Sequence, residues 1–318
     1  MKRLPAAALL TTIALAQQSP AQQSSPNTSL DTGTPPSARA GVTSMDFELR
    51  DNLVTLPVVI NDKPQTAVLD SGAGAIVVDD KAAAELKLDA ADSDGEVAGA
   101  GAQAQQLRPV SLASMSVGSL RFEKVAGYAV NLEQLSSSAG YPINVLLGAP
   151  VFKDRVVTVD YKHKRLTFAA RGKGPACSRP IPMDFVHDIP VVVAELRPTP
   201  GAAPLRLRLL VDLGTRHHAV LLGGAFARSE AGKALVRAGV PQQVGHGTGG
   251  AVQGSVAQTA ELRLGAYRIV EPQVALTSGV GAFDAAGVDG SLGAPLWKEG
   301  AITFDYQAKQ LCLPGLPS

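Results

Sequence analysis

The sequence has few of the residues that mark cysteine-rich, metal-binding or nucleic-acid-binding proteins. Its 318 residues include two cysteines, five histidines and one tryptophan, and the formal net charge is +1. Without a cluster of Lys and Arg, the chain lacks the concentrated positive charge that binds a nucleic-acid backbone, so no nucleic-acid partner is expected. The histidines show no H-E-x-x-H or comparable spacing, so we expect no metal and no other cofactor.

Long apolar stretches and the motifs of other hydrolases are also absent. No segment reaches the roughly 18 uninterrupted apolar residues of a membrane-spanning helix, so no membrane span is expected. The chain contains no G-x-S-x-G motif, and neither Cys177 nor Cys312 lies in a nucleophile motif. The sequence therefore disfavours a serine or cysteine hydrolase. In an oxidising compartment the two cysteines can form one disulfide, with two buried thiols as the alternative.

The beginning of the chain resembles an export signal followed by a polar linker. Residues 1–16 combine a basic start with a short apolar stretch and an Ala-Leu-Ala cleavage sequence, which predicts a signal peptide. Residues 17–42 are rich in Gln, Ser, Pro and Thr and contain little to bury, which indicates a disordered linker. We therefore expect an exported protein, either periplasmic or secreted.

The rest of the chain repeats itself. Five short segments recur in the same order at a spacing of about 140 residues, which indicates a tandem duplication. In the longest, "LLGAPVFKDRVVTVDYKHKRLTF" (146–168) recurs as "SLGAPLWKEGAITFDYQAKQLCL" (291–313). We expect an N-terminal lobe at 43–170, a connector at 171–182 and a C-terminal lobe at 183–318.

Both halves are composed of short, β-branched segments bounded by Gly or Pro, such as "VTLPVVI" and "RVVTVDY", which predict strands. The helix candidates are short and lie at 79–88 and 222–239. These patterns predict an all-β fold of two homologous β-barrel-like lobes with short helices.

One repeated segment presents the same acid twice. Apolar residues lead into Asp70 in "AVLDSGAGAIVV" (67–78) and into Asp212 in "LLVDLGTRHHAVLL" (209–222), and a glycine follows two residues later in each. Such a turn buries a carboxylate, and a buried charge without a partner is costly. The natural partner of each acid is the other. Two adjacent carboxyl groups share one proton, and the charged group can then activate a water molecule.

These motifs resemble those of retropepsin-like aspartic proteases. "VLDSGAGAIVV" is similar to the family's hydrophobic-hydrophobic-Asp-Ser/Thr-Gly-Ala motif, and "VLLGAPVFKDRVVTVDYKHKRLTF" is similar to its second signature. The duplicated chain resembles the bilobal, pepsin-like arrangement. The resemblance implies that Asp70 and Asp212 form a catalytic dyad that hydrolyses a peptide or protein substrate without a cofactor. Since both acids lie in one chain, we expect a monomer.

The resemblance also implies supporting residues on both sides of the substrate. Six residues would shape the two catalytic turns: Ser71, Gly72, Ala73, Leu213, Gly214 and Thr215. Glycine-containing hairpins at 95–105 and 245–255 would form flaps, with Gly99, Gly101, Gly247 and Gly249 as the candidate flap residues.

The second motif departs from the family at Leu213, where the family has Ser or Thr. Ser71 can still contribute a hydroxyl from its side, and Thr215 can bond the outer oxygen of Asp212. A cation at Arg216 would lower the pKa of Asp212. The departure leaves two alternatives open. One is a catalytically silent, exported peptide- or protein-binding module with the same fold, and the other is a homodimer that uses only its Asp70 sites.

Overall fold

The computed structural model describes residues 41–91, 95–98, 104–247, 250–277 and 282–314. The expected signal peptide and almost all of the expected linker lie outside these residues. The candidate flap residues Gly99, Gly101 and Gly249 also lie outside them.

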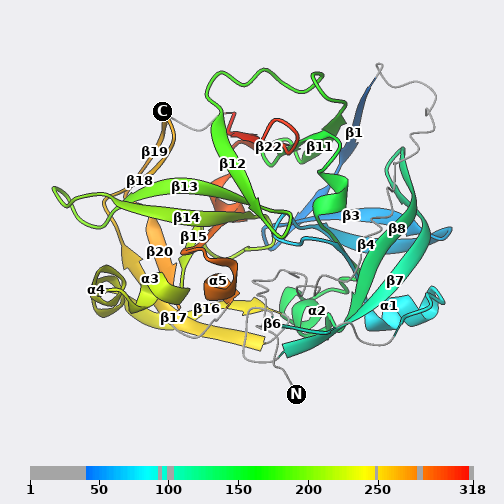
Figure 1. Ribbon diagram of the computed structural model, residues 1–318, viewed down its shortest axis with the longest axis horizontal. Helices are drawn as coiled ribbons and strands as arrows, with labels where there is room; N and C mark the ends of the chain where they lie inside the picture. Colours follow the sequence, from blue (N-terminus) through cyan, green and yellow to red (C-terminus); the bar gives the residue numbers. More distant parts are fainter. Residues whose placement is uncertain (1–40, 92–94, 99–103, 248–249, 278–281, 315–318) are drawn as a thin grey trace, which may run out of the picture.

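The two halves contain similar elements in a similar order along the chain (Figure 1). Those of the first half are β1 (Val42–Asp46), β2 (Glu48–Arg50), β3 (Leu53–Ile60), β4 (Lys63–Leu69), β5 (Ile76–Asp79), α1 (Asp80–Glu85), β6 (Gly95–Ala98), β7 (Ala104–Val117), β8 (Leu120–Val130), α2 (Glu133–Ala139), β9 (Val145–Leu147), the 3-10 turn η1 (Ala149–Val151), β10 (Val156–Asp160) and β11 (Arg165–Ala169). Those of the second half are β12 (Ile181–Val186), β13 (Ile189–Arg197), β14 (Leu205–Asp212), β15 (Val220–Leu222), α3 (Gly224–Arg228), α4 (Glu230–Ala238), β16 (Val240–Gly247), β17 (Gly250–Gln258), β18 (Glu261–Leu264), β19 (Tyr267–Val270), β20 (Gln273–Leu276), α5 (Ala282–Ala286), β21 (Gly290–Gly293), η2 (Ala294–Leu296), β22 (Ala301–Asp305) and β23 (Gln310–Cys312).

The first half forms a sheet in the order β2-β3-β4-β9-β5-β8-β7-β6, and an additional pairing of β3 with β7 closes it into a barrel-like ring. Strand β9 lies between β4 and β5, parallel to the former and antiparallel to the latter. This arrangement places the ends of β4 and β9 side by side, and the first aspartate turn begins at that point.

The second half repeats this arrangement. Strand β21 lies between β14, to which it is parallel, and β15, to which it is antiparallel. The long β7–β8 hairpin of the first half is replaced here by two shorter pairs, β17 with β20 and β18 with β19. The expectation of an all-β fold with similar halves and short helices is therefore confirmed.

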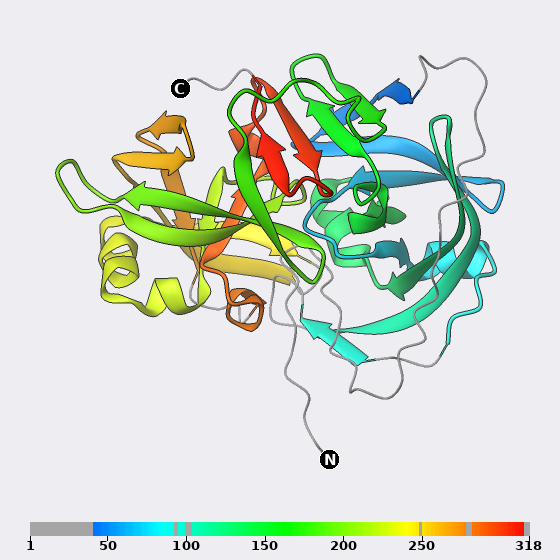
Figure 2. The same ribbon diagram turned by 45° about the horizontal axis from the view of Figure 1, so that its top comes forward.

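The two halves meet in a shared sheet. Strand β10 pairs antiparallel with β22, and their flanking hairpin partners β11 and β23 lie on either side (Figure 2). The repeat-equivalent residues Thr158 and Thr303 face each other at the centre, with 2.9 Å between their hydroxyl oxygens. Because equivalent residues pair with each other, the halves are related by an approximate two-fold axis at this point.

An aromatic cluster packs beneath the shared sheet and spans both halves. Phe152 meets Phe304 edge-on at 5.2 Å between ring centroids and stacks on Tyr306 at 5.5 Å. Each fully buried side chain of this size contributes about 1.5–3 kcal/mol through removal of apolar surface from water.

The helices differ in part from the sequence prediction. Helix α1 forms within 79–88, where the Asp79 carboxylate caps it by accepting the N–H groups of Lys81 and Ala82. The segment 222–239 is not one helix, because Ser229 ends α3 and caps α4 with its side chain. Helices α2 and α5 were not expected. In the part of the chain that the structure describes, no helix is long and apolar enough to cross a membrane.

A disulfide joins Cys177 of the connector to Cys312 of the last strand. The two residues are separated by 135 positions in the sequence, so the bond links the junction of the two halves to the end of the second half.

We expect the double variant Cys177→Ser with Cys312→Ser to unfold with a free energy about 2–5 kcal/mol lower than the oxidised wild type, because the cross-link restricts a long loop of the unfolded chain. Chemical denaturation measures this difference, and reduced wild type serves as the control that should match the variant. Two free thiols on the unfolded, unreduced wild type would show that the bond does not form.

Candidate active site

Each aspartate lies where a central strand of its half ends. Asp70 directly follows β4 and donates its backbone N–H to the carbonyl of Leu147 at 3.0 Å, while Asp212 is the last residue of β14. Both side chains are buried, with exposed fractions of 1% and 0%. The β9 and β21 strands therefore hold the two turns against the core of each half.

The glycines of the second signature allow the chain to pass close to each turn. A Cβ atom on Gly148 would lie 2.4 Å from the carbonyl oxygen of Ala73, and one on Gly293 would lie 2.5 Å from that of Thr215. The next N–H group in each half donates to the same carbonyl at 2.8 Å. The two motifs that the sequence repeats are thus parts of one local structure in each half.

The structure brings the two turns together within a single chain. The carboxyl groups of Asp70 and Asp212 interact through a side-chain hydrogen bond. Gly214 lies so close to the first acid that a Cβ atom there would be 2.8 Å from the Asp70 Oδ1 atom. Only glycine at this position leaves room for both carboxyl groups.

Backbone donors orient each carboxyl group. Gly72 N–H donates to Asp70 Oδ1 at 2.9 Å, and Gly214 N–H donates to Asp212 Oδ1 at 2.8 Å. The second acid has two further donors, since the N–H and the hydroxyl of Thr215 donate to its Oδ1 and Oδ2 at 3.2 and 2.8 Å. The two acids therefore occupy similar turns with unequal hydrogen bonding.

A serine hydroxyl connects the turns across the interface. The Ser71 hydroxyl donates to the carbonyl of Val211 at 2.7 Å and accepts the N–H of Leu213 at 3.1 Å. The Leu213 side chain is fully buried in the main hydrophobic core and supplies no hydroxyl in return. Only the first half therefore supplies a hydroxyl to this connection.

The environment separates the roles of the two acids. Burial, followed by the charge of Asp212 and the hydrogen bond with it, raises the pKa of Asp70 well above the usual value. Burial also raises the pKa of Asp212, but its hydrogen bonds from Thr215 and Asp70 oppose this effect. Because the hydroxyl of Thr215 donates to Asp212 Oδ2 and such a bond favours the charged carboxylate, we expect Asp212 to carry the charge and Asp70 the shared proton.

The expected effect of Arg216 is not among the main causes of the shifted pKa of Asp212, which are burial and hydrogen bonds from Thr215, Asp70 and Gly214. The Arg216 guanidinium extends away from the dyad to Asp51 of the first half, with 2.8 Å between Nη1 and Oδ2, and burial keeps the pKa of Asp212 raised. Among the described residues there is no group of three or more His, Cys, Asp or Glu side chains that could hold a metal ion.

The two expected flap hairpins are described only in part. Strand β6 pairs with β7 in the first, and β16 pairs with β17 in the second, where Gly247 lies opposite Gly250. Strand β16 also contacts α2 of the first half.

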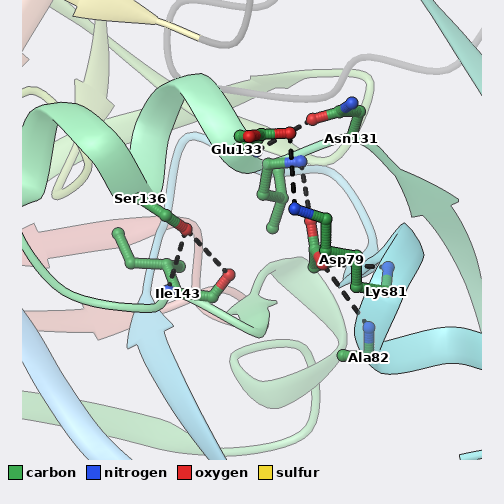
Figure 3. A network of polar contacts seen from close by, with 8 residues as sticks. Asp79, Lys81, Ala82, Asn131, Glu133, Ser136 and Ile143 are labelled. Atoms are coloured by element: carbon green, nitrogen blue, oxygen red, sulfur yellow. Dashed lines mark hydrogen bonds and ion pairs between the residues drawn. The ribbon is translucent and has the colours of Figure 1, made fainter. Parts of the chain in front are cut away.

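Helix α2, which was not predicted, is held by a polar network (Figure 3). The Asp79 carboxylate accepts the N–H of Leu132 at 2.9 Å, and the Ser136 hydroxyl accepts the N–H of Ile143 at 3.0 Å. An ion pair of 3.4 Å links Lys81 of α1 to Glu133 of α2. The network holds α2 in place, and Ser138 of this helix accepts a hydrogen bond from Arg216, which follows the Asp212 turn.

Comparison with known proteins gives a family match within the first half of the chain. Residues 56–151 match the family model described as Aspartyl protease. The crystal structure of a retropepsin-like aspartic protease from Rickettsia conorii is similar over 41% of this chain and 92% of that chain, with 18% sequence identity and a TM-score of 0.29. None of the curated proteins matches the chain. The family match confirms the resemblance to aspartic proteases in the first half, which contains Asp70.

We expect Ser71→Ala to lower the free energy of unfolding by about 1–3 kcal/mol, because it leaves the buried N–H of Leu213 and the carbonyl of Val211 without this partner. The matched control is Ser255→Ala, since the Ser255 hydroxyl is buried without a hydrogen-bond partner among the described residues. That control should change stability little. Equal losses in the two variants, measured by chemical denaturation, would contradict a tie at Ser71.

Asp70→Asn is expected to gain stability relative to wild type as pH rises from 3 to 7. A raised pKa in the folded state means that the Asp70 contribution is complete below the ordinary Asp pKa and is lost as pH rises through the folded-state value. Each unit of that shift corresponds to about 1.4 kcal/mol. Denaturation at several pH values measures the difference, with Asp89→Asn at an exposed position as the control. A difference that moves in the opposite direction would contradict the raised pKa.

Proposed function

Because its first half matches the aspartyl protease family, we propose that the protein is an aspartic endopeptidase in which Asp70 and Asp212 hydrolyse peptide bonds with an activated water. The observation that carries the proposal is the hydrogen-bonded contact between two buried carboxyl groups from equivalent turns of one chain. Two carboxyl groups in such contact share one proton, which is the arrangement that acid–base attack on an amide needs.

In the proposed first step, charged Asp212 takes a proton from water while Asp70 donates its proton to the carbonyl oxygen of the substrate. The water oxygen bonds to the carbonyl carbon, which gives a neutral tetrahedral diol. In the second step, Asp212 donates its proton to the amide nitrogen, the C–N bond breaks, and Asp70 takes a proton from the diol. The products are a carboxylic acid and an amine, and the dyad returns to its starting protonation state.

One chain would be the catalytic unit. Both acids of the dyad come from the same polypeptide, which supports a monomer with two lobes, at 43–170 and 183–318, rather than a homodimer that uses only Asp70. The substrate would be a peptide or protein bound between the lobes beneath the two hairpins.

We also infer export to the periplasm or secretion. The support comes from the signal-like residues 1–16 and from the bond between Cys177 and Cys312, since disulfides persist in oxidising compartments.

Leu213 favours a second candidate function, a catalytically silent module that binds peptides between the same two lobes. The fully buried leucine removes the hydroxyl that would complete the tie between the turns. Such a module would bind peptides without cleaving them.

Digestion of a peptide library between pH 3 and 8 tests the proposal. Wild type is expected to cleave with a bell-shaped pH profile, because Asp212 must be charged and Asp70 protonated, and chelators should have no effect. Asp70→Asn and Asp212→Asn should each lower kcat/KM by at least about 10³-fold with the fold intact, whereas Asp89→Asn should not. Full turnover in either dyad variant would reject the mechanism, and binding without cleavage by wild type would favour the silent module.

A further inference from the structure

The second active-site turn carries an arginine that the first turn lacks. Arg216 follows Asp212 by four positions, and the equivalent position after Asp70 is Gly74. We propose that Arg216 is a positioning residue that anchors the second turn to the first half and takes over the tie that Leu213 does not make. This inference rests on the proposed function of the dyad.

Arg216 reaches across the interface at three atoms. Its Nη1 lies 2.8 Å from Asp51 Oδ2, and its Nη2 donates to the hydroxyl of Ser138 at 2.5 Å. The side-chain amide of Asn52 donates to the Arg216 carbonyl oxygen at 2.9 Å. All three partners belong to the first half, so side chain and backbone of Arg216 are both attached to the opposite half.

Burial makes these contacts obligatory. The Arg216 side chain is 2% exposed, whereas that of Asp51 is 43% exposed. A guanidinium removed from water to this extent destabilises the fold unless an anion and hydrogen-bond acceptors compensate it. Its Nε and Nη1 atoms have no hydrogen-bond partner among the described residues, so the compensation depends on the ion pair of Nη1 with Asp51 and on the hydrogen bond from Nη2 to Ser138. If the halves separated at this point, the buried guanidinium would lose Asp51 and Ser138 as its partners.

The anchoring points are themselves fixed. Asp51 and Asn52 form the tight turn between β2 and β3, where both residues have positive φ angles of 49° and 61°. Ser138 lies on α2, which the network of Figure 3 attaches to α1 and to Asp79 at the end of β5. Arg216 is thus bound to a rigid turn and to a braced helix.

Arg216 affects the proposed catalytic dyad through its neighbour Thr215. This residue directly precedes Arg216, and its hydroxyl donates to Asp212 Oδ2 at 2.8 Å, a contact that lowers the pKa of the acid. If the anchor is lost, the contact weakens, the pKa of Asp212 rises, and the charged form is present only at higher pH. The acidic limb of the activity profile would then move upward.

Other titratable groups lie near both residues and must be considered. Asp70 acts on Asp212, and the charge of Asp212 acts in turn on Tyr161. Asp51, Tyr141 and His217 lie near Arg216. The pKa of Tyr161 is raised by burial and that of His217 is lowered by burial, so the tyrosine stays neutral across the acidic limb.

The test compares Arg216→Met and Arg216→Lys with the partner variants Asp51→Asn and Ser138→Ala. Arg216→Met is expected to lower kcat about 10–100-fold with little change in KM, as for a displaced catalytic group, and to move the acidic limb to higher pH. Arg216→Lys should recover part of both effects. Arg228→Met, which removes an exposed arginine paired with Asp284, is the matched control and should change neither.

A wild-type kcat and pH profile in folded Arg216→Met would overturn the proposal, and so would a raised KM with unchanged kcat. If that variant does not fold, Asp51→Asn and Ser138→Ala must both shift the acidic limb upward, and the absence of a shift in both would overturn it. Titration of ¹³C-labelled aspartates by NMR needs no activity. A raised pKa of Asp212 in the Arg216 variants would support the anchor even if wild type cleaves no peptide, and an unchanged pKa would refute it.

Discussion

The hydrogen-bonded contact between Asp70 and Asp212 is the constraint on which the rest of the site depends. Two carboxyl groups buried this deeply are tolerated only if they share a proton and accept hydrogen bonds from nearby donors. Their meeting requires equivalent strands that end at the same axis, a glycine at position 214 that leaves room for the first acid, and a shared sheet that fixes the halves relative to each other. The duplicated fold supplies all three conditions.

The two halves contribute different hydrogen-bonding groups to the site. The first half contributes the hydroxyl that crosses the interface, and the second contributes the additional donor of Thr215 to its own acid. Burial raises the pKa of both acids, and the hydrogen bond from Thr215 opposes this effect at Asp212. Asymmetry therefore assigns one acid to hold the proton and the other to hold the charge. A leucine at 213 is compatible with this division, because its backbone N–H still takes part in the tie.

Much of the fold was predictable because the duplication presents each sequence motif twice, once in each half. Several of the strands, the two aspartate motifs and the glycine of each second signature are visible in the sequence. Helix α2 was not, since its Ser-rich segment "EQLSSSA" has no side-chain cap at its beginning and its stability comes from tertiary contacts. The partner of Arg216 could not be predicted either. Sequence proximity placed its charge beside Asp212, whereas its long side chain extends to Asp51, a partner that only the folded interface brings near.

A crystal structure at atomic resolution measures the central claim most directly, through the separation of the inner carboxyl oxygens of Asp70 and Asp212. The account predicts a separation within hydrogen-bond range, about 2.5–3.0 Å, with unequal C–O bond lengths that identify Asp70 as the protonated acid. Carboxyl groups more than about 5 Å apart, each paired with a separate cation or exposed to solvent, would contradict it.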